Sequence, residues 1–121
     1  YEPTKAARSI SDFVQEKLSN WYVRLSRRRF WKGNYEKDKI AAYQTLFECL
    51  LETSKLIAPI APFFGDFLYK NLTENTFSEK FESVHLSDFP SAKKEFIDIH
   101  LESQINKARN ITSLALSLRK K

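Results

Sequence analysis

The sequence contains few of the residues that make tight turns or covalent cross-links. Two glycines and four prolines in 121 residues argue against a fold with many tight turns and favour helices. Cys49 is the only cysteine, so an internal disulfide and a cysteine-based zinc site are excluded, and we expect an intracellular, reducing compartment such as the cytoplasm. The chain has no methionine, even at its first residue, and begins in helix-like sequence, so we expect it to be a piece of a longer protein.

Long apolar runs and catalytic motifs are absent as well. No stretch of about 18 apolar residues occurs, and the N-terminus lacks the apolar segment of a signal peptide, so we expect neither membrane insertion nor secretion. No glycine-rich phosphate loop and no nucleophile-elbow serine are present. Neither His85 nor His100 has a second ligand at a metal-binding spacing. We therefore expect neither an active site nor a metal site within the chain.

The remaining composition fits one folded domain over residues 1–121. Apolar residues make up 42% of the chain, and ten residues are phenylalanine. The charged fraction of 29% is too balanced in sign for a disordered chain. A chain of this length can bury one core, but it cannot hold separate cofactor and substrate domains.

Apolar residues recur at helical spacing in the first half of the chain. A stripe from Ile10 to Leu25 predicts a first helix over roughly residues 4–30, which Gly33 then ends. A second stripe from Ile40 to Ile57 has the same spacing. It predicts another long helix.

Prolines separate the second helix from a third. Pro59 and Pro62 end the second helix, because proline removes a backbone donor and disfavours a helical residue before it, while the first turn of a new helix tolerates proline. The third, shorter helix carries the apolar residues of 63–72. From Thr73 to Ser91 the periodicity fails, which predicts a long ordered loop, and helical spacing returns from Ile97 to Ala115. The predicted fold is all-α: an antiparallel helical bundle of about four helices with one long irregular connection.

One stretch carries the positive charge of the chain. Residues 20–32 read NWYVRLSRRRFWK, residues 17–32 contain six cations, with Lys17 and Lys32 included, and no acid lies between Glu16 and Glu36. Because the net charge of the whole chain is only +5, the basic character is local. Cations beside aromatic rings suit a nucleic acid, since phosphates need neutralising and unpaired bases need a surface on which to stack. The alternative is a solvated helix face whose lysine and arginine stems pack over the core.

A helical turn of about 100° per residue separates core from surface within this stretch. It places Trp21, Tyr22 and Leu25 on the core face. Beside that face it predicts an exposed ridge of four residues: Asn20, Arg24, Arg27 and Trp31.

The other cations of the stretch are predicted to differ in exposure. We expect Arg28 near the core edge, where it can reach an acidic partner, and Arg29 and Lys32 in solvent. Arg24 could equally form a structural ion pair with one of two glutamates on the second helix, Glu48 or Glu52.

Three segments, in this order and at these separations, resemble the anticodon-binding domain of isoleucyl-tRNA synthetases. They are LSNWYVRLSRRRFW at 18–31, LIAPIAPFFGDFLYKNL at 56–72 and SVHLSDFP at 83–90. The closing RNITSLALSLRKK also resembles that family, so the resemblance covers essentially the entire chain. The APxxPF motif is shared with the related leucine and valine enzymes, whereas NWYVR followed by SRRRFW and SVHL points to the isoleucine member.

The resemblance implies a class Ia aminoacyl-tRNA synthetase. In such an enzyme a catalytic domain uses ATP, with magnesium, to activate isoleucine, an editing domain removes mischarged valine, and a helical domain grips the anticodon stem and loop of isoleucine tRNA. Zinc in the parent enzyme is left open. The chain lacks the His-Ile-Gly-His and Lys-Met-Ser-Lys-Ser signatures and the first helix of the family bundle. We therefore expect a partial anticodon-binding domain, without catalytic residues, whose partners are the tRNA and the remaining domains of the synthetase.

The incomplete bundle would leave apolar surface through which the isolated chain could dimerise.

Seven residues are the predicted tRNA contacts. Asn20 is assigned to a polar base or backbone contact, and Trp31 to base stacking. The arginines Arg24 and Arg27 are assigned to phosphates or base edges, and the remaining cations to phosphates: Arg28, Arg29 and Lys32. Two alternatives stay open, a stand-alone helical module that binds RNA or an acidic protein, and the anticodon domain of a valine or leucine enzyme.

Overall fold

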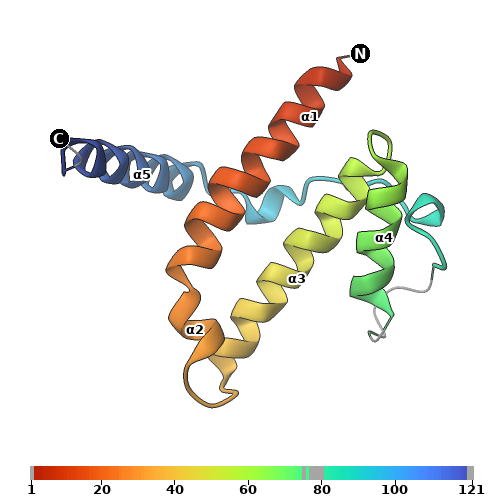
Figure 1. Ribbon diagram of the computed structural model, residues 1–121, viewed down its shortest axis with the longest axis horizontal. Coiled ribbons are helices and arrows are strands. Elements are labelled where there is room, and N and C mark those ends of the chain that lie inside the picture. Colours follow the sequence, from red (N-terminus) through yellow and green to blue (C-terminus); the bar gives the residue numbers. More distant parts are fainter. Residues whose placement is uncertain (1, 75, 77–80, 120–121) are drawn as a thin grey trace. The chain divides into compact units, whose positions relative to one another are not determined.

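The computed structural model describes residues 2–74, 76 and 81–119. It divides into two compact units, Tyr1–Pro90 and Ser91–Lys121, which are described separately. Every regular element among the described residues is a helix or a helical turn, so the predicted all-α class is confirmed (Figure 1). No described helix is long and apolar enough to cross a membrane.

The predicted first helix is divided into three parts. It consists of α1 (Pro3–Asp12), the π-helical segment η1 (Phe13–Val23) and the short helix α2 (Arg27–Trp31). In η1 the hydrogen bonds span five residues, as when the Arg24 N–H donates to the carbonyl oxygen of Ser19. Ser26, with φ −85° and ψ 6°, then departs from helical geometry before α2 begins. Residues 3–25 and 27–31 are helical, so the predicted span of roughly 4–30 is helical nearly throughout, with one interruption at Ser26.

The π-helical segment also changes which side chains face the core. Each residue of a π-helix turns through a smaller angle than in an α-helix, so a count at 100° per residue loses its phase across η1. Tyr22 is half-buried as predicted, but Leu25 is 64% exposed, and the prediction that it faces the core is wrong. Ser26 and Phe30 are buried instead.

The next two helices agree with the prediction. Helix α3 (Lys37–Ile57) ends before Pro59, and α4 (Pro62–Thr73) begins on Pro62, so the two prolines bracket a short turn between antiparallel neighbours (Figure 1). Gly65 lets them approach closely, because a Cβ at this position would lie 3.0 Å from both the Cα of Ala58 and the carbonyl oxygen of Ser54. The main core forms here, from Leu51, Ala58, Tyr69 and Val84.

The expected ordered loop over 73–91 is described only in part, and its described part is held to α4. The carboxylate of Asp66 accepts hydrogen bonds from the Ser83 hydroxyl at 2.6 Å and from the Val84 N–H at 3.0 Å. Lys70 forms an ion pair with the same carboxylate at 2.7 Å. These bonds position the 3₁₀ turn η2 (Val84–Leu86) with Val84 in the core.

The second unit contains the 3₁₀ turn η3 (Lys94–Phe96) and helix α5 (Ile99–Arg119). Helical structure begins two residues later than the apolar spacing predicted, because Ile97 has extended backbone angles. The carboxylate of Asp98 accepts a hydrogen bond from the Leu101 N–H at 3.0 Å and caps the helix.

Candidate nucleic-acid interface

An aromatic cluster attaches α2 to α3. The ring of Phe30 is 6% exposed, and its centroid lies 5.1 Å from that of Tyr43 and 6.3 Å from that of Tyr22. The Tyr43 hydroxyl donates to the carbonyl oxygen of Phe30 at 3.1 Å, and the Tyr22 hydroxyl donates to that of Ala42 at 3.0 Å. The edge-to-face contact with Tyr22, the tilted contact with Tyr43 and the two hydroxyl hydrogen bonds give α2 a fixed position on α3.

A bidentate ion pair provides a second attachment. The Arg29 guanidinium donates to the Asp38 carboxylate through Nε at 2.8 Å and through Nη2 at 2.7 Å. These hydrogen bonds raise the pKa of Arg29 and lower the pKa of Asp38. Arg29 is thus half-exposed and paired, so the prediction that it is exposed holds only in part. A contact between consecutive helices cannot be read from the periodicity of either helix.

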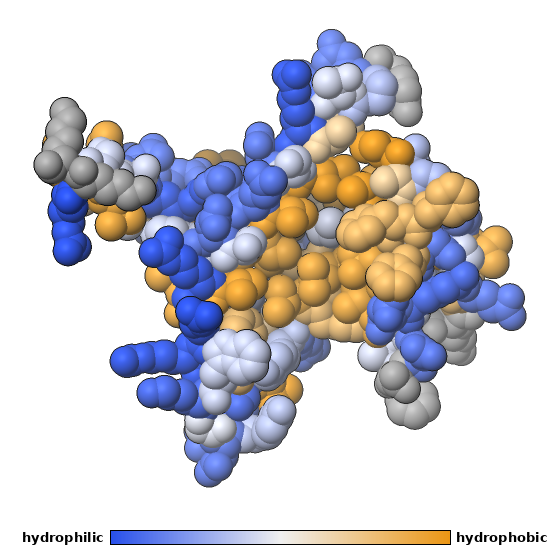
Figure 2. Space-filling model, in the orientation of Figure 1, coloured by the Kyte–Doolittle hydropathy of each residue, from blue (hydrophilic) through white to orange (hydrophobic). Residues whose placement is uncertain are grey.

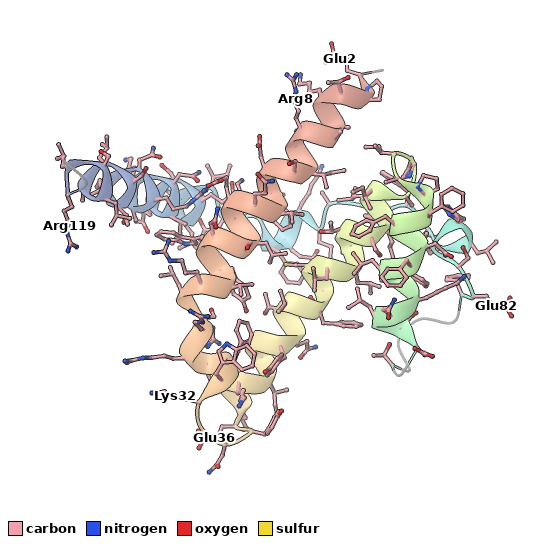
Figure 3. All side chains as sticks on the ribbon, viewed as in Figure 1. Glu2, Arg8, Lys32, Glu36, Glu82 and Arg119 are labelled. Atoms are coloured by element: carbon pink, nitrogen blue, oxygen red, sulfur yellow. The ribbon has the colours of Figure 1, made fainter. Side chains whose placement is uncertain are left out.

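Four side chains around α2 remain on its solvent side, and we call this set the α2 outer face: Arg27, Arg28, Trp31 and Lys32. Trp31 is 77% exposed, so most of its ring is open to a ligand. Arg28 is exposed rather than at the core edge, which corrects its predicted place. Figure 3 shows Lys32 projecting away from the helices. Residues four apart are neighbours on a helix, so Arg27 lies beside Trp31. The N–H of Lys32, which follows the helix, donates to the carbonyl oxygen of Arg28 at 3.0 Å.

Asn20 and Arg24 are also exposed, but they belong to the preceding segment. The Asn20 amide lies 3.4 Å from the carboxylate of Glu16, a long hydrogen bond. The predicted straight ridge through Asn20, Arg24, Arg27 and Trp31 assumed α-helical geometry throughout. Because η1 and the Ser26 turn intervene, the single helical face on which that ridge depended does not exist, although all four side chains reach solvent.

The alternative role for Arg24 is not supported. Among the ion pairs of the described residues, none joins Arg24 to Glu48 or Glu52, and Glu52 pairs with Lys55 at 3.6 Å instead. The guanidinium of Arg24 is therefore available for another partner.

The turn between α2 and α3 contributes an aromatic residue that the sequence interpretation missed. Tyr35 is 76% exposed, and the ammonium of Lys39 lies 4.6 Å from its ring centroid. The same ammonium donates to the carbonyl oxygen of Gly33 at 3.3 Å, where φ is +79° and the chain reverses. The available signal was an aromatic residue inside the stretch without acids, directly after the basic run.

The surroundings of this region are hydrophilic and contain no described metal site. Figure 2 shows hydrophilic side chains at the end of the first unit that holds α2, whereas apolar surface lies over α3 and α4. No group of three or more histidine, cysteine, aspartate or glutamate residues that could hold a metal ion occurs in the described part of the chain. The chemistry available at the α2 outer face is thus that of cations and a flat ring, which suits phosphates and unpaired bases.

Comparison with known proteins agrees with this chemistry. The family model described as the anticodon-binding domain of tRNA ligase matches residues 1–121. The isoleucine–tRNA ligase of Bacteroides thetaiotaomicron is 53% identical over 121 residues, which are 100% of this chain and 10% of that protein. That of Cytophaga hutchinsonii is 55% identical over 120 residues, 99% of this chain and 11% of the relative. That of Thermus thermophilus is 44% identical over 121 residues, 100% of this chain and 12% of the relative.

The chain therefore spans about a tenth of the length of these relatives. The resemblance stated from the sequence motifs is confirmed over the whole chain. The chain belongs to the family of anticodon-binding domains of tRNA ligases.

Proposed function

We propose that this chain binds the anticodon stem-loop of isoleucine tRNA, as the helical domain of an isoleucine–tRNA ligase. Family membership supports the anticodon as the target, and the names of the relatives support isoleucine as the amino acid. The observation that carries the proposal is the α2 outer face, where three exposed cations lie within four residues of a tryptophan that is 77% exposed.

The cations and the ring of the α2 outer face suit different parts of a nucleic-acid loop. Arg27, Arg28 and Lys32 would neutralise phosphates, which gives affinity without sequence preference. Trp31 would stack on an unpaired base of the loop. The buried ring of Phe30 and the Arg29–Asp38 ion pair fix α2, so less conformational freedom is lost when the tRNA binds.

The π-helical segment offers a second set of contacts. Asn20 lies on η1, and Arg24 lies four residues later, directly after the end of η1. Both side chains are exposed. An amide can donate to and accept from a base edge, and a guanidinium can bind two acceptors at once. We assign Asn20 to a base or backbone contact and Arg24 to a base edge or phosphate. Arg29 can fill its predicted role as a phosphate contact only if a phosphate of the tRNA replaces the Asp38 carboxylate as the partner of its guanidinium.

For the longer protein we propose the activity that its relatives' name describes. It would attach isoleucine to its tRNA with ATP and magnesium, in the cytoplasm, and residues 1–121 would act as one anticodon-binding domain beside its other domains. We assign ATP, magnesium and any zinc to other parts of that protein.

The isolated chain is also proposed to self-associate through apolar surface. A groove of about 380 Å³ between α1–η1 and the α3–α4 pair is lined mostly by apolar side chains, among them Ile10, Val14, Leu50, Ile57, Phe64 and Leu68. Exposed apolar surface of this kind favours association. Sedimentation of the isolated chain should show a dimer that Phe64→Glu returns to monomer.

Affinity for isoleucine tRNA tests the proposed function. Trp31→Ala and Arg27→Ala in the full-length protein should each weaken binding about ten-fold or more. Two matched controls remove similar groups elsewhere: Arg8→Ala removes an exposed arginine of α1, and Phe63→Ala removes a ring of α4 that is 92% exposed. If the controls weaken binding as much as the α2 variants, or if neither α2 variant changes it, the proposed interface is wrong.

A further inference from the structure

The ring of Tyr35 is exposed enough to contact a ligand, and neighbouring residues hold it in place. Its side chain is 76% exposed, close to the 77% of Trp31, so neither ring contributes to the core. The ring is nevertheless held in place from one side.

Lys39 holds that side. Its side chain belongs to α3 and the residue is only 9% exposed, with the ammonium 4.6 Å from the Tyr35 centroid and hydrogen-bonded to Gly33. A lysine with so little exposed surface, whose ammonium already has these two contacts, is poorly placed to bind a phosphate. It can hold the ring through a cation–π contact, and this leaves the opposite ring face to solvent.

The turn that carries Tyr35 is fixed as well. Gly33 takes a positive φ of +79°, and the Glu36 N–H donates to the carbonyl oxygen of Asn34 at 2.9 Å. Helix α3 then begins at Lys37. A ring on a turn fixed at both ends loses little entropy when a ligand stacks on it.

Tyr35 also lies near the α2 outer face along the chain. Four residues of extended chain span at most about 14 Å, so the Cα atoms of Trp31 and Tyr35 lie within that distance. Lys32 lies between them in sequence and is exposed. Two exposed rings separated by a cation match the alternation of bases and phosphates in a single strand.

From these observations, and on the basis of the function proposed above, we propose that Tyr35 is a second stacking platform, which takes an unpaired base of the same tRNA loop that Trp31 contacts. Lys39 is the positioning residue that fixes the ring, and Trp31 and Tyr35 take different bases.

The test is a double-mutant cycle between the protein and the tRNA. Affinity would be measured for the full-length protein with isoleucine tRNA and with versions of it that carry one abasic site in turn along the anticodon loop. Tyr35→Leu should weaken binding of intact tRNA about five- to a hundred-fold, whereas Tyr35→Phe, which keeps the ring, should leave affinity within about two-fold. One abasic position should weaken binding to the wild type but not to Tyr35→Leu, because each change removes the same stacked pair.

The outcomes separate this inference from the proposed function. If Trp31→Ala weakens binding while Tyr35→Leu does not, the function stands and the second platform is wrong. Tyr35→Leu could instead weaken binding by an amount that adds to the loss of affinity caused by every abasic site. Tyr35 would then support the turn and stack on no base, and the inference is again wrong. If the wild type does not distinguish isoleucine tRNA from one without its anticodon loop, the proposed function itself fails.

Discussion

Arg29 and Asp38 join the middle of α2 to the first turn of α3 through two parallel hydrogen bonds, at 2.8 Å and 2.7 Å between guanidinium nitrogens and carboxylate oxygens. A third hydrogen bond, at 3.2 Å, runs from the same guanidinium to the Asp38 backbone carbonyl. This arrangement gives one arginine of the basic stretch a structural role, while its neighbours Arg27 and Arg28 stay in solvent.

The ion pair predicts that the effects of substituting Arg29 and Asp38 on tRNA binding are not additive. Arg29→Met and Asp38→Asn should each weaken tRNA binding slightly, because each loosens α2, and the double variant should be no weaker than either one. Affinity for isoleucine tRNA of the full-length variants measures this. If Arg29→Met still weakens binding in the Asp38→Asn background, and the salt dependence falls by about one phosphate contact, Arg29 binds the tRNA directly.

The carboxylate of Asp66 predicts a loss of stability in acid. Hydrogen bonds from Lys70, Ser83 and the Val84 N–H lower the pKa of Asp66 from 3.8 to about 2. Because the unfolded chain binds this proton more tightly than the folded chain, the contribution of Asp66 to the free energy of unfolding is complete above about pH 4 and is lost as pH falls toward 2.

Thermal unfolding of the chain between pH 2 and 5 would show this contribution. Asp66→Asn should lower the melting temperature at pH 5 and make it less dependent on pH below 4. A melting temperature that falls equally steeply in acid for Asp66→Asn and wild type would show that other groups cause the loss.

Two glycines should respond differently to substitution. Gly65→Ala places a methyl group 3.0 Å from backbone atoms of Ala58 and Ser54, so α3 and α4 must separate, which should cost about 1–3 kcal/mol. A methyl group at Gly33 meets nothing within 4 Å, but φ of +79° strains any L-residue. Asparagine tolerates such angles best. In urea unfolding, Gly33→Asn should therefore lower the free energy of unfolding less than Gly33→Ala does. At Gly65 the order should be reversed, with a larger loss for Gly65→Asn than for Gly65→Ala. Equal effects of asparagine and alanine at both positions would contradict this assignment.

The sequence predicted those features that depend on local signals. Pro59 and Pro62 define the boundary between α3 and α4, and the apolar stripe from Ile40 to Ile57 coincides with α3. The exposure of Trp31 and Arg27 was also anticipated. Leu25 was placed wrongly because nothing in the residue pattern reveals a π-helical segment, and the error in phase accumulates along it.

Features that depend on contacts between elements could not be predicted in this way. The partners Arg29 and Asp38 lie on different helices, and their pairing requires the turn geometry that Gly33 provides. The fixed ring of Tyr35 depends on Lys39 in the same manner. A helical projection treats each helix alone, so it assigns exposure but not partners.

The salt dependence of tRNA binding tests the central claim most directly. The full-length protein and a variant with Arg27, Arg28 and Lys32 all replaced by alanine would be titrated with isoleucine tRNA over a range of salt concentrations. If the α2 outer face binds phosphates, the slope of log affinity against log salt should become shallower by about two to three in the variant, while the Arg8→Ala control keeps the wild-type slope. An unchanged slope in the triple variant would contradict the account, because it would mean that these three cations release no counterions from the tRNA.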